Sequence, residues 1–417
     1  MKVAVIGAGI IGVTTAYELG RDGHEVTVFE RRGAAAEETS FANAGIVAPG
    51  YVTPWAAPGM PAKVLQQILR RHASVKVGLP LSMQELGWIW KWYRACRLET
   101  YLVNRAHLQK LAFYSRARLH AIRTHLRLEY DRSDGYLVLL RTERDQQMAQ
   151  PSLQVLRAAG VNFRQLDPVQ ARAVEPALNP DTAFAGAIQL PDDEVGNCRQ
   201  FALLLKNEAQ RIGVAFRFNT AVERLEKSAG STVLVAGDAV PRTFDCVVLC
   251  AGLASGHLLK PLGLGIPMAA VYGYSLSAAI REPLNAPRSA IMDEHYKVAI
   301  SRLGQRIRVA GSAELGGAAD RKRASSIQTL YKVLHDWFPG AANTATGVQE
   351  WKGARPMLPD GPPIVAASGI PGLWLNLGHG SSGWALSCGS ARVVADLVLG
   401  HQPEVDMQGF GPGRFGH

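Results

Sequence analysis

The sequence predicts an α/β fold that joins a parallel sheet to a second part built around a mixed or antiparallel sheet. The first observation is the apolar run Val3–Ile6, which leads directly into a glycine turn and a helix. The second is the alternation of apolar and polar residues between Pro267 and Glu314, which is typical of short antiparallel strands. The third is another unit of strand, glycine loop and helix that begins at Leu373. The change of strand type along the chain indicates two structural parts.

The bulk composition describes a folded globular protein. The chain has 417 residues, enough for two domains, of which 47% are hydrophobic and 19% charged. We expect no transmembrane helix, because the sequence lacks a run of about eighteen apolar residues. We also expect no cleaved export signal, because the N-terminal apolar run is interpreted as a buried strand. The five cysteines are scattered without a zinc pattern, so we expect reduced thiols, no metal site and a cytoplasmic protein.

The glycine turn has the spacing G-x-G-x-x-G at Gly7, Gly9 and Gly12. The first glycine permits the tight turn, the second lets the backbone approach a pyrophosphate, and the third lets the helix pack closely on the strand. Ile10 and Ile11 begin the helix, whose free N–H groups and partial positive charge suit phosphate groups. The sequence therefore predicts a dinucleotide-binding turn of the Rossmann type, with an ordinary βαβ corner as the alternative.

A second strand, Glu25–Phe29, ends at Glu30, about twenty residues beyond the turn. A carboxylate at this place can accept hydrogen bonds from the ribose hydroxyls of an adenosine, and the basic residue Arg31 follows it. These residues leave NAD and FAD equally open.

The segment Glu38–Gly45 has small residues with hydrogen-bonding tips, which suits a loop pressed against a cofactor. An ordinary helix-capping loop is the alternative. The next segment, Ile46–Pro61, is rich in proline and glycine and is expected to be a long irregular loop.

The region from Lys63 to Leu128 is expected to be mainly helical, and it is unusually basic and aromatic. Its charged and aromatic residues gather in Arg70–His72, in Trp88–Arg94 and at Arg97. Tryptophan and tyrosine beside lysine and arginine are typical of a helix at a lipid headgroup boundary. The alternative is a helical subdomain whose tryptophans pack inward. The net charge of +10 favours anionic partners, either a membrane surface, an acidic protein or nucleic acid.

Further elements are expected from local patterns. The expected strands are Gly135–Leu140, Val161–Leu166, Ala215–Phe218, Val222–Glu226, Ser231–Ala236 and Cys246–Cys250, and short strands around Tyr274, Tyr296 and Ile307. The expected helices are Gln146–Ala159, Arg199–Ile212, Ser325–Trp337 and one that ends near Leu399. His401–His417 is expected to be a loosely held tail.

The glycine loop Gly378–Gly383 and its helix start decide between the two dinucleotides. A nicotinamide enzyme needs one such fingerprint, whereas FAD is long and must be held at its adenosine end and at its ring end. A helix N-terminus near the pyrimidine edge of a flavin would stabilise the negative charge gained on reduction. The sequence therefore predicts FAD.

The chain also resembles the FAD-dependent D-amino acid dehydrogenases, within the wider D-amino acid oxidase and glycine oxidase group. The motifs that carry the resemblance are Val5–Gly9 with Gly12, Gly23–Val28, Glu38–Ser40 with Ala42–Gly45, Pro49–Tyr51 with Pro54–Gly59, Gly273–Ser275, Arg355–Met357 with Pro359–Gly361, and Leu373–Asn376 with Gly378–Gly380. The resemblance implies a discontinuous FAD-binding domain of residues 1–60, 160–258 and 345–417. Residues 61–159 and 259–344 would form an α+β substrate domain.

The resemblance also implies site residues. Those implied at the cofactor are Gly7, Gly9, Ile10, Ile11, Gly12, Glu30, Arg31, Ser40, Asn43, Ala44, Gly45, Val222, Ala251, Gly252, Gly353, Arg355, Gly378, His379, Gly380 and Ser381. His379 is interpreted as a backbone contact rather than as a catalytic base.

Arg355, in the sequence Gly353-Ala354-Arg355-Pro356, matches the arginine that the family uses to hold the substrate carboxylate. A guanidinium fork pairs bidentately with a carboxylate, and a surface arginine before a proline is the alternative. Tyr274 and Tyr296 are expected either to contact the substrate or to be core tyrosines with satisfied hydroxyls.

Two departures from the family pattern affect the substrate side. Tyr272 stands where the resemblance leads us to expect a lysine, and His295 stands where a smaller residue is expected. Both are candidate site residues, so the preferred substrate side chain stays open.

The resemblance implies oxidative deamination of D-amino acids by hydride transfer to FAD, with electrons passed to a quinone or another acceptor. Two alternatives remain. One is a related amine flavoenzyme of the D-proline, D-hydroxyproline, glycine or sarcosine type, and the other is a flavoprotein that binds nucleic acid, which we do not expect.

Overall fold

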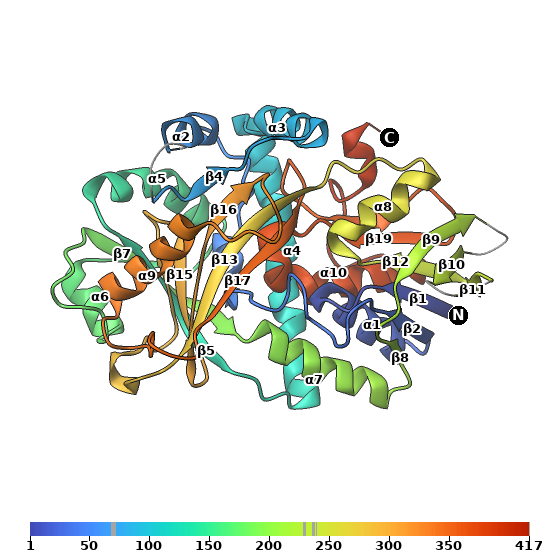
Figure 1. The fold of residues 1–417 in the computed structure, drawn as a ribbon, viewed down its shortest axis with the longest axis horizontal. Coiled ribbons are helices and arrows are strands. Elements are labelled where there is room, and N and C mark those ends of the chain that lie inside the picture. The colour runs from blue at the N-terminus through green and yellow to red at the C-terminus, as the bar shows by residue number, and fades with distance from the viewer. Residues whose placement is uncertain (68–71, 228–230, 236–237, 239, 417) are drawn as a thin grey trace.

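The computed structural model describes residues 1–67, 72–227, 231–235, 238 and 240–416, and within them two large sheets occupy opposite halves of the molecule (Figure 1). The six-stranded sheet, on the right in Figure 1, has the order β18-β19-β12-β1-β2-β8. Its strands are β1 (Lys2–Ile6), β2 (Glu25–Phe29), β8 (Ala215–Arg217), β12 (Cys246–Leu249), β18 (Ile364–Ala367) and β19 (Leu373–Leu377). All neighbours pair in parallel except β18 with β19. The predicted parallel sheet is confirmed.

Alternate residues of β1 face two different cores. Val3 and Val5 pack with the helices α1 (Ile10–Arg21), α7 (Cys198–Arg211) and α10 (Gly383–Val398). Ala4 and Ile6 face the other side, toward α8 (Ser255–Leu259) and a small sheet. The small sheet consists of β9 (Val222–Lys227), β10 (Ser231–Val235) and β11 (Arg242–Phe244). Because both faces of β1 are buried from Val3 to Ile6, this part of the strand is uniformly apolar.

The second large sheet has ten strands among the described residues and is mixed. Its strands are β3 (Ile46–Val47), β4 (Val75–Val77), β5 (Arg132–Leu140), β6 (Arg164–Leu166), β7 (Gly186–Gly196), β13 (Ala269–Ala279), β14 (Ala290–Asp293), β15 (Val298–Leu303), β16 (Arg306–Leu315) and β17 (Gln349–Met357). It therefore includes strands from 160–196 and 349–357, which the predicted domain boundaries assign to the FAD-binding segments. Those boundaries stay a prediction.

The two faces of this ten-stranded sheet meet different neighbours. One face carries Leu276, Ile300 and Val309 and packs against α9 (Ala324–Trp337), so we call it the α9 face. The other carries Ser301 and Arg308, whose side chains donate hydrogen bonds to the carbonyls of Ala44 and Asn43. We call this second side the loop face.

The expected helical region contains α2 (Met60–Gln67), α3 (Met83–Ala95) and α4 (Leu98–Leu126), with α2 and α3 along the upper edge in Figure 1. On α3, Trp88 and Trp92 are buried, whereas Trp90 is 61% and Tyr93 is 56% exposed. Inward packing therefore holds for Trp88 and Trp92, and the membrane-surface interpretation of the exposed Trp90 and Tyr93 stays a prediction. Arg70 and Arg71 lie outside the described residues. Of the helices described, none is both long and apolar enough to cross a membrane.

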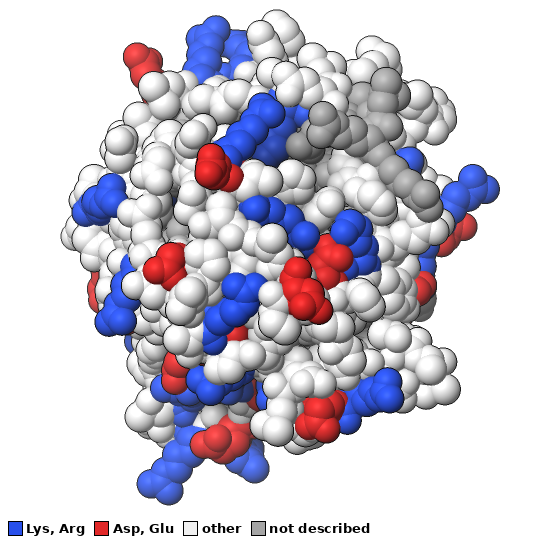
Figure 2. All heavy atoms as spheres, turned by 90° about the vertical axis from the view of Figure 1, so that its left-hand side faces the viewer, with Lys and Arg blue, Asp and Glu red and all other residues white. Residues whose placement is uncertain are grey.

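The helices α5 (Glu143–Ala158) and α6 (Pro168–Val174) lie at the left of Figure 1. On the side of the molecule drawn in Figure 2, Lys and Arg side chains are interspersed with Asp and Glu. The positive net charge is therefore not gathered into one patch on this face.

Three local expectations differ from the structure. The eleven-residue strand β7 was not expected as a strand, because its centre contains Pro191 and acidic residues. Tyr296 lies in the turn between β14 and β15 rather than on a strand. The C-terminal segment is not loosely held, since Phe410 is 1% exposed and Arg414 Nε lies 2.7 Å from Asp360 Oδ2.

Candidate active site

The N-terminal turn is held in place by two side chains from later segments. Glu30 Oε2 accepts a 2.7 Å hydrogen bond from the Ala8 N–H, and Ser40 Oγ accepts one of 3.0 Å from the Ile10 N–H. Gly7 has φ +101°, and a Cβ at Gly12 would clash with the Gly7 carbonyl, so the turn requires both glycines. The predicted residues of the turn are therefore brought together. Arg31 is paired with Glu38 beside it.

The loop Asn43–Gly45 has all three of its carbonyls held from outside. Arg308 Nη1 donates to Asn43 O at 3.1 Å, and Ser301 Oγ donates to Ala44 O at 2.7 Å. Gly45 O accepts from Trp384 Nε1 at 3.1 Å and from the Gly196 N–H at 2.8 Å. Donors from β16, β15, α10 and β7 thus fix this loop on the loop face of the sheet.

Arg355 lies on the loop face, at the end of β17. Its partner across β13 is Val271, and its guanidinium covers Gly273, where an added Cβ would clash with it. Arg355 Nη1 donates to Ser312 O at 3.1 Å, and among the described residues no carboxylate forms an ion pair with Arg355. Burial lowers the pKa of Arg355 to about 10, so the group stays charged at neutral pH. A buried cation of this kind is a place for an anionic ligand group.

Tyr272 and Tyr274 are on the opposite, α9 face, because side chains alternate along a strand and both are one residue out of step with Gly273. The Tyr274 hydroxyl is hydrogen-bonded to Glu314, and the ring is 1% exposed. Lys352 Nζ lies 3.1 Å from Glu314 Oε2 and 4.3 Å from the centre of the Tyr272 ring. The structure thus gives Tyr274 the role of a core tyrosine and does not bring either ring to Arg355.

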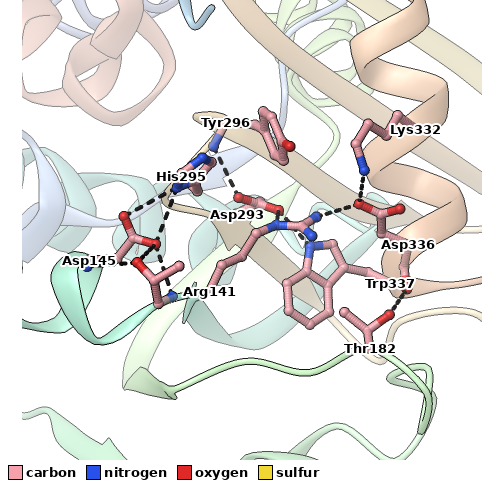
Figure 3. A network of polar contacts seen from close by, with 10 residues as sticks. Arg141, Asp145, Thr182, Asp293, His295, Tyr296, Lys332, Asp336 and Trp337 are labelled. Atoms are coloured by element: carbon pink, nitrogen blue, oxygen red, sulfur yellow. Dashed lines mark hydrogen bonds and ion pairs between the residues drawn. The ribbon is translucent and has the colours of Figure 1, made fainter. Parts of the chain in front are cut away.

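Tyr296 and His295 belong to a different polar network, shown in Figure 3. The Arg141 guanidinium lies 4.9 Å from the ring centres of both Tyr296 and Trp337, and it pairs with Asp293 and Asp336 at 2.7 Å. His295 Nδ1 lies 3.3 Å from the carboxylate of Asp145 on α5. These contacts tie the β14–β15 turn to α9 and α5.

The C-terminal glycine loop joins β19 to α10 beside the end of β17. Met357 and His379 form an isolated bridge, and an added Cβ at Gly380 would lie 2.6 Å from Met357 Sδ. His379 Nε2 lies 3.1 Å from Ser390 Oγ, and burial lowers the pKa of His379 to about 3. His379 is therefore a neutral side chain near neutral pH, and Gly378–Ser381 present mainly backbone.

A family model described as "FAD dependent oxidoreductase" matches residues 2–397. The chain belongs to this family. It is 42% identical to a D-amino acid dehydrogenase of Allorhizobium ampelinum over 97% of this chain and 96% of that protein. It is 41% identical to one of Bradyrhizobium diazoefficiens over 100% of this chain and 99% of that protein. Among solved structures it is similar to glycine oxidase from Geobacillus kaustophilus, with a TM-score of 0.77, 22% identity, and coverage of 99% and 98%.

An FAD-dependent oxidoreductase needs a cradle for a dinucleotide, and the residues present fit one. The tight Gly7–Gly12 turn, the anchored Glu30 carboxylate and the fixed Asn43–Gly45 loop provide backbone groups in a rigid arrangement. Ala251 follows the central strand β12, and its Cα would lie 3.2 Å from a Cβ at Gly7. FAD is the cofactor of the family.

Three residues that hold the Asn43–Gly45 loop were missed by the sequence interpretation, namely Arg308, Ser301 and Trp384. Each acts across a long sequence separation. The Arg308 contact to Asn43, for example, spans 265 residues. Local patterns in the sequence carry no signal for such contacts.

Proposed function

We propose that the protein deaminates D-amino acids oxidatively, with FAD as the electron acceptor in the first half-reaction. The observation that carries this is Arg355, a partly buried guanidinium without a carboxylate partner in the described part of the chain, beside the C-terminal glycine loop. The family match and the names of the relatives support the same reaction. Bound FAD would supply the two-electron acceptor for this reaction: loss of hydride from the α-carbon of the neutral amine would give the imino acid, which water would hydrolyse to a 2-oxo acid and ammonia.

Arg355 binds the substrate carboxylate in this proposal. A guanidinium can donate two parallel N–H bonds to a carboxylate, which fixes the orientation of the α-carbon as well as its position. Arg355 is itself fixed, because it rests on Gly273 and donates to Ser312 O. The site therefore acts mainly by holding the substrate in one orientation.

We propose that FAD is bound by the two glycine loops and by the segments between them. Gly7, Gly9, Gly12 and Glu30 would hold the adenosine and pyrophosphate, with Val222, Ala251 and Gly252 nearby. Asn43–Gly45 and Gly378–Ser381 would lie along the flavin ring. The three-segment division of the FAD-binding domain belongs to the same proposal.

The test is anaerobic reduction of the FAD-loaded protein by a panel of D- and L-amino acids, followed by flavin absorbance. D-amino acids with several side chains should bleach the flavin, and their L-enantiomers should not. Bleaching by D-proline or D-hydroxyproline alone, or by glycine and sarcosine alone, would instead assign a related amine activity. Arg355→Lys should bleach more slowly at equal substrate concentration, because a lysine keeps the charge and loses the fork.

We also propose that electrons leave to a quinone or another acceptor at a membrane surface touched by α2–α4. Leu65, Leu79 and Met83 are 75%, 80% and 83% exposed on this edge. A cavity of about 530 Å³ on α3 is lined by Trp90, Tyr93, Arg94 and Arg97, among others. Exposed apolar and aromatic side chains beside arginines suit a headgroup boundary with anionic lipid.

Co-sedimentation with anionic vesicles tests the surface contact. The protein should pellet at low salt, and Trp90→Ala combined with Met83→Ser should reduce the pelleted fraction. A neutral-vesicle control measures the charge contribution. No pelleting at low salt would contradict the contact and would leave the deamination proposal intact.

A further inference from the structure

Two glycines face each other across β13 and β17 on the loop face. Gly273 is the direct partner of Gly353 in the strand register. A Cβ at Gly273 would clash with the guanidinium of Arg355, and a Cβ at Gly353 would clash with the indole of Trp351. The two side chains therefore lie folded down over the two glycines. We call this pair of glycines the glycine shelf.

The glycine shelf brings the indole and the guanidinium to the same place. Directly opposed residues in an antiparallel pair have Cα atoms about 4.5–5.5 Å apart. Because Arg355 covers Gly273 and Trp351 covers Gly353, the two groups are neighbours on a surface with no other side chain between them. A carboxylate held by Arg355 thus has its remaining substituents close to the face or edge of an indole.

Trp351 differs from three of the packed tryptophans, although Trp92, which is also buried, likewise has no acceptor for its N–H. Trp88, Trp337 and Trp384 are each 2% exposed or less, and each donates its N–H to a protein acceptor. Trp351 is only partly buried, and within the part of the chain that the structure describes its N–H has no protein acceptor and its ring has no aromatic partner. An indole left open in this way has a face available for a ligand.

Lys352, which follows Trp351 in β17, and Glu314 do not share the surface on which Trp351 and Arg355 lie. Lys352 points to the α9 face, where it is bonded to Glu314 and to the carbonyls of Ala318 and Arg321. Glu314 is likewise bonded on that side to Tyr274 and Arg323. The surface beside Arg355 therefore offers an apolar aromatic wall.

We propose that Trp351 is the specificity-determining residue for the substrate side chain. With the carboxylate on Arg355, the side chain of a D-amino acid packs against the indole, which favours apolar side chains large enough to reach it. D-leucine, D-methionine and D-phenylalanine fit this description, and D-aspartate and D-glutamate do not. The inference rests on the proposed D-amino acid activity.

The experiment compares kcat/KM for D-leucine and D-alanine in FAD-loaded Trp351→Ala, Trp351→Phe and the parent protein. Loss of apolar contacts of this size changes selectivity by about tenfold or more. Trp351→Ala should lower the ratio of D-leucine to D-alanine by at least that factor, and Trp351→Phe should restore most of it. Trp374→Ala on β19, which removes a partly buried tryptophan of the other sheet, is the matched control and should leave the ratio unchanged.

Gly353→Ala supplies a second, independent variant. The added methyl group displaces the indole, so the ratio should fall as it does in Trp351→Ala. In the double variant the second change should add little, because the group that it displaces is already gone. Equal losses for D-leucine and D-alanine in Trp351→Ala, or a parent protein that prefers D-aspartate, would overturn the inference. A parent protein that no D-amino acid reduces would overturn the proposed function instead.

Discussion

The two faces of the ten-stranded sheet differ in whether their charged side chains are paired with opposite charges. On the α9 face, Glu314 is bonded to Arg323 and Lys352, and Arg141 is bonded to Asp293 and Asp336. On the loop face, Arg355 and Arg308 each donate only to a backbone carbonyl among the described residues. Burial lowers the pKa of both arginines to about 10, so neither becomes neutral near pH 7.

The difference separates charges that are paired within the protein from charges that are left without a counter-charge among the described residues. In a buried ion pair each charge compensates the other. Removing one partner leaves the other charge buried without a counter-charge, which destabilises the protein. A buried guanidinium without an anion keeps its capacity to bind one, and the fold must supply the stability that it costs. Tyr272 and Tyr274 belong to the first kind of environment, and Arg355 to the second.

Removing one partner of an ion pair on the α9 face should have the largest effect on stability. Burial raises the pKa of Glu314, but the hydrogen bonds from Tyr274, Arg323 and Lys352 outweigh it and hold the pKa below the usual range. Glu314→Gln leaves Lys352, 3% exposed, without its counter-charge. The free energy of unfolding should fall by about 3–5 kcal/mol in urea titrations. A loss under about 1 kcal/mol would show that the pair is not needed.

Replacing Arg355 on the loop face should leave the stability unchanged and remove activity. Arg355→Met eliminates a partly buried charge that has no anion among the described residues, so the free energy of unfolding should stay equal or rise. Loss of a charge-assisted pair to substrate costs about 2–5 kcal/mol, so kcat/KM for D-amino acids should fall by about 30- to 5,000-fold. Stopped-flow flavin reduction measures the change. Retained FAD absorbance shows that the variant is folded.

Loss of the side-chain hydrogen bonds that hold the Asn43–Gly45 loop should weaken FAD binding more than substrate binding. Arg308→Met removes the charged donor to Asn43 O, a bond worth about 1.5–3 kcal/mol, so FAD should dissociate about 10- to 100-fold more readily. Ser301→Ala removes a neutral donor to Ala44 O and should have a smaller effect. Titration of the apoprotein with FAD, followed by fluorescence quenching, measures both. A larger effect of Ser301→Ala would contradict the ranking.

Asp193 is a buried acid that, unlike arginine, can become neutral by binding a proton. Burial raises the pKa of Asp193 to about 7, while Arg116, with Nη1 3.4 Å from Oδ1, lowers it only in part. The pKa of Asp193 is higher in the folded state than in the unfolded state. The stability that goes with the protonated Asp193 carboxyl group is therefore fully present below pH 4 and is lost as the pH rises through 7.

Asp193→Asn tests this sign. The variant should come closest to the parent at pH 4, and its advantage should grow as the pH rises to 7, reaching about 1–3 kcal/mol in the free energy of unfolding at pH 8. A variant that is less stable than the parent at pH 8 would mean that the ionised carboxylate is stabilised by Arg116.

The parts that could be predicted from the sequence are those with local signals. The turn at Gly7–Gly12, the strand that ends at Glu30 and the loop at Gly378 depend on spacings within about 20 residues. Arg355 was found because it stands in a short motif. The faces of β13 could not be predicted, because they depend on which residue of β17 lies opposite Gly273, about 80 residues away.

The positions of the other candidate residues, away from Arg355, have the same physical origin. Tyr274 follows Gly273, over which the Arg355 guanidinium lies. Because side chains alternate along a strand, this offset of one residue places the Tyr274 side chain on the opposite face. His295 and Tyr296 follow a strand, but their partners Asp145 and Arg141 come from a segment about 150 residues earlier. Contacts of this kind are fixed by the packing of the whole sheet.

Binding of a simple carboxylate tests whether Arg355 is the carboxylate anchor. Benzoate should perturb the flavin absorbance of the FAD-loaded protein saturably. Arg355→Lys should bind it more weakly, Arg355→Met should show no saturable change, and Arg308→Met, once loaded with FAD, should bind it like the parent. Unchanged benzoate affinity in Arg355→Met would contradict the account.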